Sequence, residues 1–516
     1  MKESPHGKLL LGIDIGMGGA KCAFYDCRGN YVAGKGAEYG IITPRPGWAE
    51  QNPEDWWQAV TACIRECIGN QGISPADVAA VGVSCTNAVV PVDRDGKAVH
   101  NAIVLFDQRT DREVRWIKEN LGEERVFRVT GNRVARGTFS LPSMLWLLKN
   151  RPEVAEKTWK FLVPSGFVTH KLTGNFSITK SRLSYTLLAD VRKGDWDADL
   201  ARDAGVPLSM LPTPYAATDV VGTVQASAAA ATGLLEGTPV IAGAMDTASA
   251  AFASGAAKEG AIFLTVGSTV RLCYTTDSDR FDRRFMNTSG VMGPKWLYTG
   301  ATSGAGASLR WFRDTFGRAM PGLEPGTEPS FEDLSESAAG ASPGAGGLLY
   351  LPYLVGERSP IWNPEARGVF FGIGLNTAFA DFARAIMEGV GFSIRHLAEI
   401  ILRNASAPPA IALSGGASKS AVWCQIIADI VGHPLIRLEL GETETLGAAL
   451  VAGHGAGLIR DPIGLIDMLV KKGKVYYPDP ANKSLYDGMY ALFLNVYADT
   501  EKDFLLLARS RDEQAP

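Results

Sequence analysis

Short apolar runs alternate with amphipathic stretches along the chain. In the first third, apolar residues run together over 9–15 and 78–84, which predicts strands, and recur three and four positions apart over 56–68, which predicts a helix. Asn52-Pro53 precedes this helix and supplies a capping side chain and a proline near its first turn. Strands that alternate with helices in this way predict an α/β protein.

The same kind of unit occurs twice. An apolar strand, a turn of glycine or small hydroxyl residues and a second strand are expected around 9–25 and again around 259–274. We interpret this likeness as a duplication of one lobe. No fixed period of about 20–50 residues exists, so the chain is not a solenoid. We place one boundary near residue 250, between an N-terminal lobe, 1–250, and a C-terminal lobe, 251–516.

Composition narrows the class of protein. The 516 residues are 46% hydrophobic and 21% charged, which is typical of a globular protein with large cores. The net charge of −4 argues against a nucleic-acid partner. No uncharged apolar run reaches about 18 residues, and the apolar part of the N-terminus is too short for a signal peptide. The seven cysteines follow no metal or disulfide spacing. We therefore expect a reduced, cytoplasmic protein without a membrane partner.

Glycine is in excess, at 57 of 516 residues, and it gathers in the segment 12–21. This segment contains Asp14, Gly16, Gly18 and Gly19. A glycine-rich turn lets backbone N–H groups approach phosphate oxygens, and a carboxylate at the strand end can hold the Mg²⁺ that bridges them. The segment is not a P-loop or a dinucleotide fingerprint, because a strand follows the turn. A hairpin that merely needs glycines of positive φ would give the same pattern.

Asp246 is a candidate general base. It lies where a strand is expected to end and a helix to begin, among small residues over 243–247. A carboxylate in such a place can accept a proton from a substrate hydroxyl. An aspartate that caps the following helix is the alternative, and the local pattern alone favours the cap.

Two C-terminal segments are less specific. Gly415, Gly416 and Ser418 lie between an expected strand and an expected helix, which suits contact with a nucleotide at the helix N-terminus but also suits an ordinary turn. Glu357 and Arg358 lie in a charged loop, where such residues more often form a structural ion pair than a catalytic pair.

The order of these motifs is more informative than any one of them. The segments concerned are 12–16, 46–53 with Trp56 and Trp57, 107–110, 130–133, 353–358 with Arg367 and Gly368, 414–416 with Trp423, Ala428 and Asp429, and 446–449. Together they resemble the FGGY family of carbohydrate kinases, most closely its xylulokinase-like members, over about 9–497.

The resemblance implies a two-lobed, actin-like ATPase fold of the ribonuclease H-like type, with a cleft between the lobes. It also implies transfer of the γ-phosphoryl group of ATP, with Mg²⁺, to a hydroxyl of a sugar or polyol. Asp246 matches the catalytic base of the family, which reverses the preference for a cap, and Asp14 matches the carboxylate that organises Mg²⁺. Dimers are common in this family.

The resemblance also assigns binding residues. Those on the sugar side are Thr86, Asn87, Asp107, Arg109, Asp246 and Thr247. Those on the ATP side are Gly16, Gly18, Gly19, Lys21, Gly267, Ser268, Thr269, Gly304, Gly306, Gly415, Gly416 and Ser418. The chain departs from the family pattern at Met17-Gly18-Gly19, where hydroxyl residues are usual, at Val270, where a glycine is usual, and at Thr86-Asn87, where Met-His is usual in xylulokinases.

These departures leave three hypotheses. The first is a pentulose kinase acting on a sugar such as D-xylulose. The second is a gluconate kinase or another sugar-acid or polyol kinase, which would need a cation near an acidic substrate; the sequence leaves open whether Arg109 or Arg136 supplies it. The third is a catalytically weak regulator that binds sugar or nucleotide, against which the presence of both Asp14 and Asp246 argues.

Overall fold

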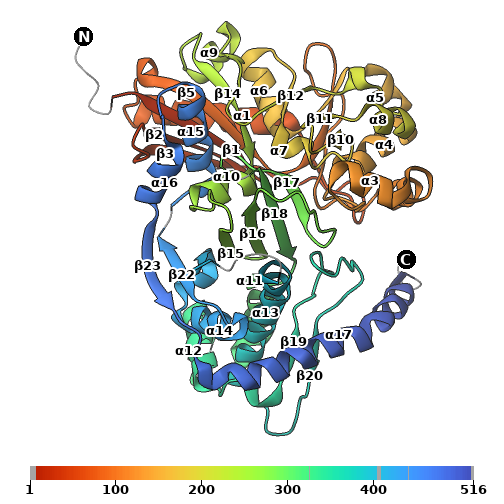
Figure 1. Ribbon diagram of the computed structural model, residues 1–516, viewed down its shortest axis with the longest axis vertical. Coiled ribbons are helices and arrows are strands. Elements are labelled where there is room, and N and C mark those ends of the chain that lie inside the picture. The colour runs from red at the N-terminus through yellow and green to blue at the C-terminus, as the bar shows by residue number, and fades with distance from the viewer. Residues whose placement is uncertain (1–6, 294, 325, 404–407, 440, 513–516) are drawn as a thin grey trace. The chain divides into compact units, whose positions relative to one another are not determined.

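The structure is a computed structural model that describes residues 7–293, 295–324, 326–403, 408–439 and 441–512. The chain forms two compact units (Figure 1). The first contains Met1–Glu259, Thr275–Tyr298 and Gly441–Val470, and the second contains Gly260–Tyr274, Thr299–Leu440 and Lys471–Pro516. The chain thus passes between the units several times, whereas the sequence suggested one boundary near residue 250. Such returns carry no local sequence signal, because each depends on packing between segments far apart in the chain.

A six-stranded sheet organises the first unit. Its order is β13 (Val220–Thr223), β14 (Pro239–Met245), β5 (Val78–Cys85), β1 (Leu9–Ile15), β2 (Gly19–Asp26) and β3 (Tyr31–Glu38). β1 and β14 are both parallel to the central β5, while β2, β3 and β13 are antiparallel to their neighbours. Three carboxyl-terminal strand ends therefore meet at one edge of the sheet, the place where ligands bind in open α/β sheets.

Helix α15 (Thr443–Gly455) packs against β1, β5 and β14 at unusually short range. A Cβ atom on Gly12 would lie 1.9 Å from the carbonyl oxygen of Thr445, and one on Gly82 would lie 2.1 Å from that of Ala448. Glycine is therefore required in both strands because the backbone of the helix touches the sheet. This packing explains why the late segment Gly441–Val470 belongs to the first unit.

The first unit contains further strands and helices, among them a second sheet with the order β4 (Glu50–Gln51), β7 (Ala102–Val104), β6 (Ala88–Val92) and β8 (Lys160–Leu162). The other strands of this unit are β9 (Ser177–Thr179), β10 (Ala189–Asp190), β11 (Asp195–Trp196), β12 (Thr213–Tyr215) and β17 (Met286–Ser289). Its other helices are α1 (Pro53–Asn70), α2 (Asp111–Trp116), α3 (Glu123–Thr130), α4 (Ser140–Asn150), α5 (Pro152–Lys157), α6 (Pro164–Thr173), α7 (Lys180–Leu183), α8 (Ala198–Ala204), α9 (Ala226–Thr232), α10 (Asp246–Ala253) and α16 (Pro462–Leu469).

The second unit contains its own mixed sheet. The strand order is β17 (which lies in the first unit), β18 (Trp296–Thr302, which begins in the first unit), β16 (Val270–Thr276, which ends in it), β15 (Ile262–Val266), β21 (Ile411–Ser414), β22 (Leu435–Glu439) and β23 (Lys471–Tyr476). β15, β21 and β22 are parallel, and β16 and β23 are antiparallel to their neighbours. A short ladder pairs β19 (Leu349–Leu351) with β20 (Val369–Phe371). Parallel strands joined through helices in both units confirm the α/β prediction.

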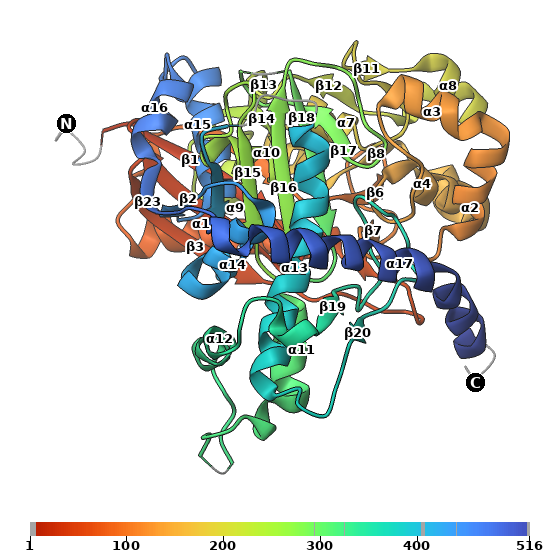
Figure 2. The same cartoon turned by 60° about the horizontal axis from the view of Figure 1, so that its bottom comes forward.

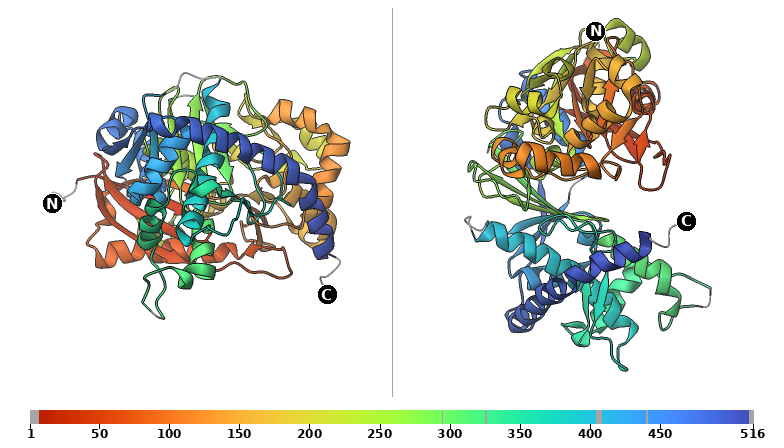
Figure 3. Two further views of the ribbon diagram at one scale, coloured as in Figure 1. Left: turned by 90° about the horizontal axis from the view of Figure 1, so that it is seen from below. Right: turned by 90° about the vertical axis from the view of Figure 1, so that its right-hand side faces the viewer.

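The described residues of the second unit also form five α-helices. They are α11 (Gly306–Phe316), α12 (Phe331–Gly340), α13 (Phe379–Leu402), α14 (Ala421–Val431) and α17 (Lys483–Asp512). α13, which the sequence predicted over 379–401, packs against α11, α12 and α14 (Figure 2). α17 runs along α14, α13 and β19 (Figure 3). None of the helices described is long and apolar enough to cross a membrane.

Candidate active site

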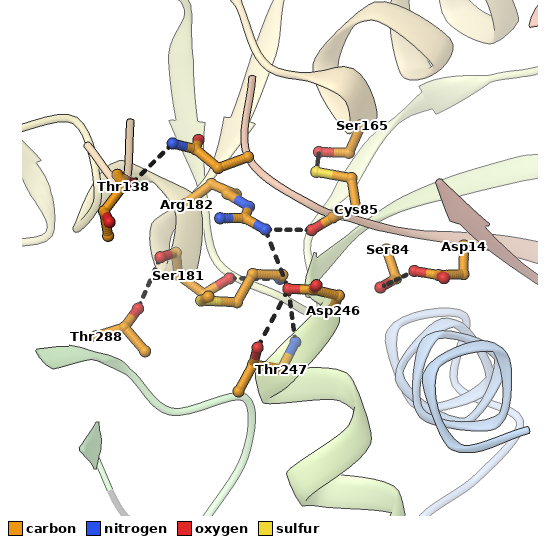
Figure 4. A network of polar contacts seen from close by, with 12 residues as sticks. Asp14, Ser84, Cys85, Thr138, Ser165, Ser181, Arg182, Asp246, Thr247 and Thr288 are labelled. Atoms are coloured by element: carbon orange, nitrogen blue, oxygen red, sulfur yellow. Dashed lines mark hydrogen bonds and ion pairs between the residues drawn. The ribbon is translucent and has the colours of Figure 1, made fainter. Parts of the chain in front are cut away.

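Two carboxylates lie at the edge where the parallel strands of the first unit end. Asp14 is the penultimate residue of β1 and is in register with Ser84 of β5, which in turn pairs with Ala244 of β14. Asp246 follows β14 directly and is the first residue of α10. Figure 4 shows Asp14 and Asp246 with Ser84 and Cys85, the last residues of the central strand. The sheet thus brings together the two acidic residues on which the sequence prediction depended.

The Asp246 carboxylate is held by neighbours on its own helix and by an arginine. Its Oδ1 accepts the backbone N–H of Thr247 at 2.7 Å and the Thr247 hydroxyl at 3.3 Å. Nη2 of Arg182 lies 3.1 Å from the same oxygen. The N-cap of α10 is Met245, so the cap that the local pattern favoured for Asp246 is not formed. With 13% of its side chain exposed, Asp246 is oriented and still partly accessible.

Asp14 is more deeply buried. Its Oδ1 accepts the hydroxyl of Ser84 at 2.9 Å. The pKa of Asp14 rises from 3.8 to about 7, mainly because of burial and also because of the negative charges of Glu444 and Asp246, against the lowering effects of Ser84 and Lys21. A cation beside Asp14 would stabilise its ionised form.

These residues fit a magnesium ion that arrives with a nucleotide. The described residues contain no group of three or more His, Cys, Asp or Glu side chains arranged to hold a metal. Mg²⁺ usually keeps several waters and takes one or two carboxylates together with substrate phosphates. Asp14 meets that requirement, because it is a single buried carboxylate near two further negative charges, Glu444 and Asp246, which would attract a cation.

Sequence reasoning missed Arg182. Its side chain is 2% exposed, and besides Asp246 it donates to the backbone carbonyl of Cys85. The only sequence signal is a single charge directly before the largely apolar stretch 183–189, which indicates that the arginine is buried but gives no partner.

Thr86 and Asn87 follow β5 directly and are nearly buried. The backbone N–H of Thr86 donates to the carbonyl of Ile15 at 2.9 Å, and the Asn87 side chain donates to the carbonyl of Thr138 at 2.9 Å. Both residues therefore lie at the same sheet edge as Asp14. Their contact with sugar stays a prediction.

Asp107 and Arg109 form a closed cluster of their own. Arg109 pairs with Asp107 at 2.7 Å and with Glu50 at 2.8 Å, and its guanidinium stacks 3.8 Å from the ring centroid of Trp48. The Arg109 side chain is only 1% exposed. The other arginine considered as a cation for an acidic substrate, Arg136, pairs with Asp111 at 2.9 Å. Both candidate cations are thus engaged by carboxylates of the chain itself.

The glycines of the first turn do not adopt positive φ, so the alternative of a hairpin that needs such glycines is wrong. Gly19 is required by packing, since its Cβ would lie 2.7 Å from the carbonyl oxygen of Ala37. A Cβ on Gly16 would lie 3.2 Å from the carbonyl oxygen of Gly19, whereas one on Gly18 would meet no described atom within 4 Å. Lys21 pairs with Glu442 at 2.6 Å, with both side chains about half exposed.

In the second unit, Gly267-Ser268-Thr269 forms the turn between β15 and β16, and the start of α11 is tied to it. The N–H of Gly306 donates to the carbonyl of Gly267 at 2.9 Å. A Cβ on Gly304 would lie 1.7 Å from the carbonyl oxygen of Pro352, and one on Gly306 would lie 2.6 Å from that of Gly267. Packing therefore requires both of these glycines.

The third glycine segment follows β21. Gly415 has φ +92°, and its Cβ would lie 2.6 Å from the carbonyl oxygen of Val266, while the hydroxyl of Ser418 donates to the carbonyl of Gly415 at 2.7 Å. A Cβ on Gly416 would meet no described atom within 4 Å, and one on Gly267 would reach only Thr269 at 4.0 Å. Gly18, Gly267 and Gly416 are therefore the predicted ATP-side glycines for which neither backbone conformation nor close packing supplies a reason.

The segment 130–133, which contributed to the family resemblance, has a structural role. The Asn132 side chain is fully buried, donates to the carbonyls of Asn287 at 2.8 Å and Ser184 at 2.9 Å, and accepts the N–H of Asn287 at 2.8 Å. These bonds hold β17 and so fix the returning segment Thr275–Tyr298 within the first unit.

Glu357 is a buried acid of the second unit. Its carboxylate accepts the N–H groups of Ser303 at 2.6 Å and Arg358 at 2.7 Å. Burial raises the pKa of Glu357 from 4.5 to about 8, although these N–H groups and the charge of Arg358 lower it.

Known proteins resemble the chain over almost its whole length. The N-terminal domain of the FGGY family of carbohydrate kinases matches residues 9–253, and the C-terminal domain of that family matches 265–456. The xylulose kinase of Bacillus subtilis (strain 168) is 31% identical over 497 residues, which covers 96% of this chain and 97% of that protein. The gluconokinase of the same strain is 28% identical over 509 residues, which covers 97% of each.

The likeness extends to three dimensions. The crystal structure of ligand-bound xylulose kinase from Lactobacillus acidophilus matches with a TM-score of 0.89 at 24% identity, covering 97% of this chain and 100% of that one. The fold is the two-lobed, actin-like ATPase type. The family matches define the class as ATP-dependent carbohydrate kinases. The chain belongs to the FGGY family of carbohydrate kinases.

Proposed function

We propose that this sugar kinase transfers the γ-phosphoryl group of MgATP to a hydroxyl of a pentulose such as D-xylulose, with Asp246 as the general base. The observation that carries the proposal is the placement of an oriented, partly accessible carboxylate, Asp246, at the same sheet edge as the buried carboxylate Asp14. The xylulose kinase named above favours a pentulose as the acceptor.

Asp246 would receive the proton of the acceptor hydroxyl. As the hydroxyl oxygen bonds to the γ-phosphorus, the bond from phosphorus to the β–γ bridging oxygen breaks, and ADP leaves with the electron pair. The proton passes to a carboxylate oxygen of Asp246. General-base help of this kind typically contributes about 10²–10⁴ in rate. The fixed Oδ1 of Asp246 favours a constant direction of approach for the hydroxyl.

Asp14 would hold Mg²⁺ together with phosphate oxygens and water. When bound, the ion would supply positive charge that offsets the negative charge developing on the phosphate oxygens. The role of the protein at this point is to place a carboxylate beside the triphosphate. Burial and the nearby charges of Glu444 and Asp246 raise the pKa of Asp14 to about 7, so a cation beside the carboxylate would favour its ionised form.

We assign the sugar and the first phosphate loop to the first unit and most of the nucleotide contacts to the second. Gly18, Gly267 and Gly416 support this assignment, because side-chain room is left open at each of them. Backbone N–H groups at such positions can approach phosphate and ribose closely.

A sugar-acid kinase is the second candidate. The gluconokinase relative favours it, and so does the buried guanidinium of Arg182, 3.1 Å from Asp246, since a cation beside the base would suit an acidic acceptor.

One assay separates these functions. ADP release would be measured with MgATP and D-xylulose, D-ribulose, L-ribulose, gluconate, glycerol or erythritol, with Asp246→Asn as the control. Turnover with a pentulose that disappears in the Asp246→Asn variant is the expected result. Turnover with gluconate alone would refute the pentulose assignment, and ATP binding without turnover on any acceptor would favour a regulator. An Asp246→Asn variant as active as the parent would refute the base.

A further inference from the structure

The end of β14, which delivers Asp246, is held by side chains of a neighbouring segment, 179–182. The hydroxyl of Thr179 donates to the carbonyl of Gly243 at 2.8 Å. The hydroxyl oxygen of Ser181 accepts the backbone N–H of Met245 at 2.9 Å. Two side chains of this segment, two positions apart, thus fix the backbone three residues and one residue before the base.

Arg182 extends the same pattern to the carboxylate itself. Its Nη2 donates both to Oδ1 of Asp246 at 3.1 Å and to the backbone carbonyl of Cys85 (Figure 4). Because the Cys85 carbonyl belongs to the buried central strand β5, the guanidinium ties the carboxylate to the end of that strand. Removing an arginine from water is costly unless it is paired, so its burial at 2% exposure is a strong local constraint.

The segment is itself supported from behind. The Thr288 hydroxyl donates to the carbonyl of Ser181 at 2.7 Å (Figure 4). The preceding residue, Asn287, is held by Asn132 through two hydrogen bonds of 2.8 Å. Buried hydrogen bonds therefore connect the returning segment Thr275–Tyr298 with Ser181, and through Ser181 with the residue that precedes Asp246. The segment thus supports the candidate site from within the first unit.

We propose that Arg182 is a positioning residue for phosphoryl transfer, which fixes one oxygen of the Asp246 carboxylate against the end of β5, and that Ser181 supports it by fixing the backbone before Asp246. The proposal rests on the proposed role of Asp246 as the base. Arg182 acts through Asp246, so its loss should slow the chemical step more than it weakens ATP binding. A misplacement of about 1 Å in a reacting group can cost about 10²-fold in rate.

The test compares Arg182→Gln, Arg182→Lys and Ser181→Ala with Asp246→Asn and with the pair Arg182→Gln/Asp246→Asn. Arg384→Gln is the matched control, because Arg384 is also buried and paired with a carboxylate, Glu388 at 2.7 Å, but in the second unit. For each variant, kcat and KM for ATP and for the accepted sugar are measured with the unfolding temperature.

We expect Arg182→Gln to lower kcat by about 10²-fold with an unchanged KM for ATP. Arg182→Lys should recover part of the loss, because lysine restores a cation that reaches Asp246 but not both of its partners. The double variant should be no slower than Asp246→Asn alone, since both changes act on one group. Arg384→Gln should lower the unfolding temperature and leave kcat close to that of the parent.

Other outcomes would overturn the proposal in distinguishable ways. A normal kcat in Arg182→Gln, with a lowered unfolding temperature, would show that Arg182 stabilises the fold and does not position the base. A raised KM for gluconate with an unchanged kcat would make it a substrate contact instead. An inactive Asp246→Asn beside a fully active Arg182→Gln would sink only the positioning role, whereas an active Asp246→Asn would sink the base and the positioning role together. Should Arg182→Gln fail to fold, Arg182→Lys and Ser181→Ala decide by the same criteria.

Discussion

Replacing Glu357 with glutamine should change how the stability of the protein depends on pH. The carboxyl is buried, and its pKa rises from 4.5 to about 8 on folding. Between these pKa values the folded state keeps a proton that the unfolded state has lost. The stabilising contribution of this group is therefore complete below pH 4.5, decreases as the pH rises to about 8, and is lost above that pH. The two pKa values differ by about 3.5, and each pKa unit corresponds to about 1.4 kcal/mol, so the free energy of unfolding should fall by up to about 5 kcal/mol over this pH range.

Glutamine has almost the same shape as the protonated acid and cannot ionise. Its Oε1 can still accept the N–H groups of Ser303 and Arg358, and Oε2 of Glu357 has no hydrogen-bond partner among the described residues, so the amide NH₂ replaces no existing bond. Chemical unfolding followed at pH 5 and at pH 8.5 should show the variant close to the parent at the lower pH and more stable by several kcal/mol at the higher. Glu332→Gln, which removes an exposed carboxylate of the same unit, is the control. A difference between Glu357→Gln and parent that is the same at both pH values would refute the reasoning.

Three further predictions follow from the candidate site and its support. Asp14→Asn should abolish transfer at ordinary Mg²⁺ concentrations and yet raise the free energy of unfolding at pH 8, because it removes a buried charge whose pKa is raised to about 7; denaturant titration with a kinetic assay checks both halves. Gly416→Ala should raise KM for ATP without changing the unfolding temperature, whereas Gly304→Ala, with a Cβ 1.7 Å from a carbonyl oxygen, should destabilise the fold. Gly12→Ala should cost about 1–3 kcal/mol or more of stability, measured by thermal unfolding, because its Cβ would displace α15 at Thr445.

Local pattern predicts the elements of this fold well and their assembly poorly. The strand over 9–15 coincides with β1, and the helix expected over 379–401 ends one residue short of α13. The spacing of apolar residues shows which face of a helix or strand is buried, and this signal lies within the segment itself. The return of Gly441–Val470 to the first unit has no such local signal. It depends on how one helix packs against glycines in strands several hundred residues away.

The candidate site shows the same division between what is local and what is not. Asp14 and Asp246 could be singled out because each lies at an expected strand end, but only the family resemblance assigned a catalytic role to Asp246. In the structure the two carboxylates lie at one edge because parallel strands bring their carboxyl ends together. Arg182 could not be singled out, because its partners lie on β5 and α10, about a hundred residues before it and about sixty after it in the chain. The local preference for a helix cap at Asp246 failed for a related reason: the arginine and Thr247 converge on its Oδ1, so tertiary contacts fix how the carboxylate points.

The many glycines of the chain fall into two groups in the structure, those that close packing requires and those that it does not. Gly12 and Gly82 are needed by the fold, because a helix backbone touches the sheet at those points. Gly18, Gly267 and Gly416 are not needed in this way, since room for a side chain is left open at each. The nucleotide contact proposed above would give these three glycines a function, since a ligand can approach a backbone that carries no side chain closely. Substitution by alanine therefore distinguishes the two sets, since the first should lose stability and the second should lose nucleotide affinity.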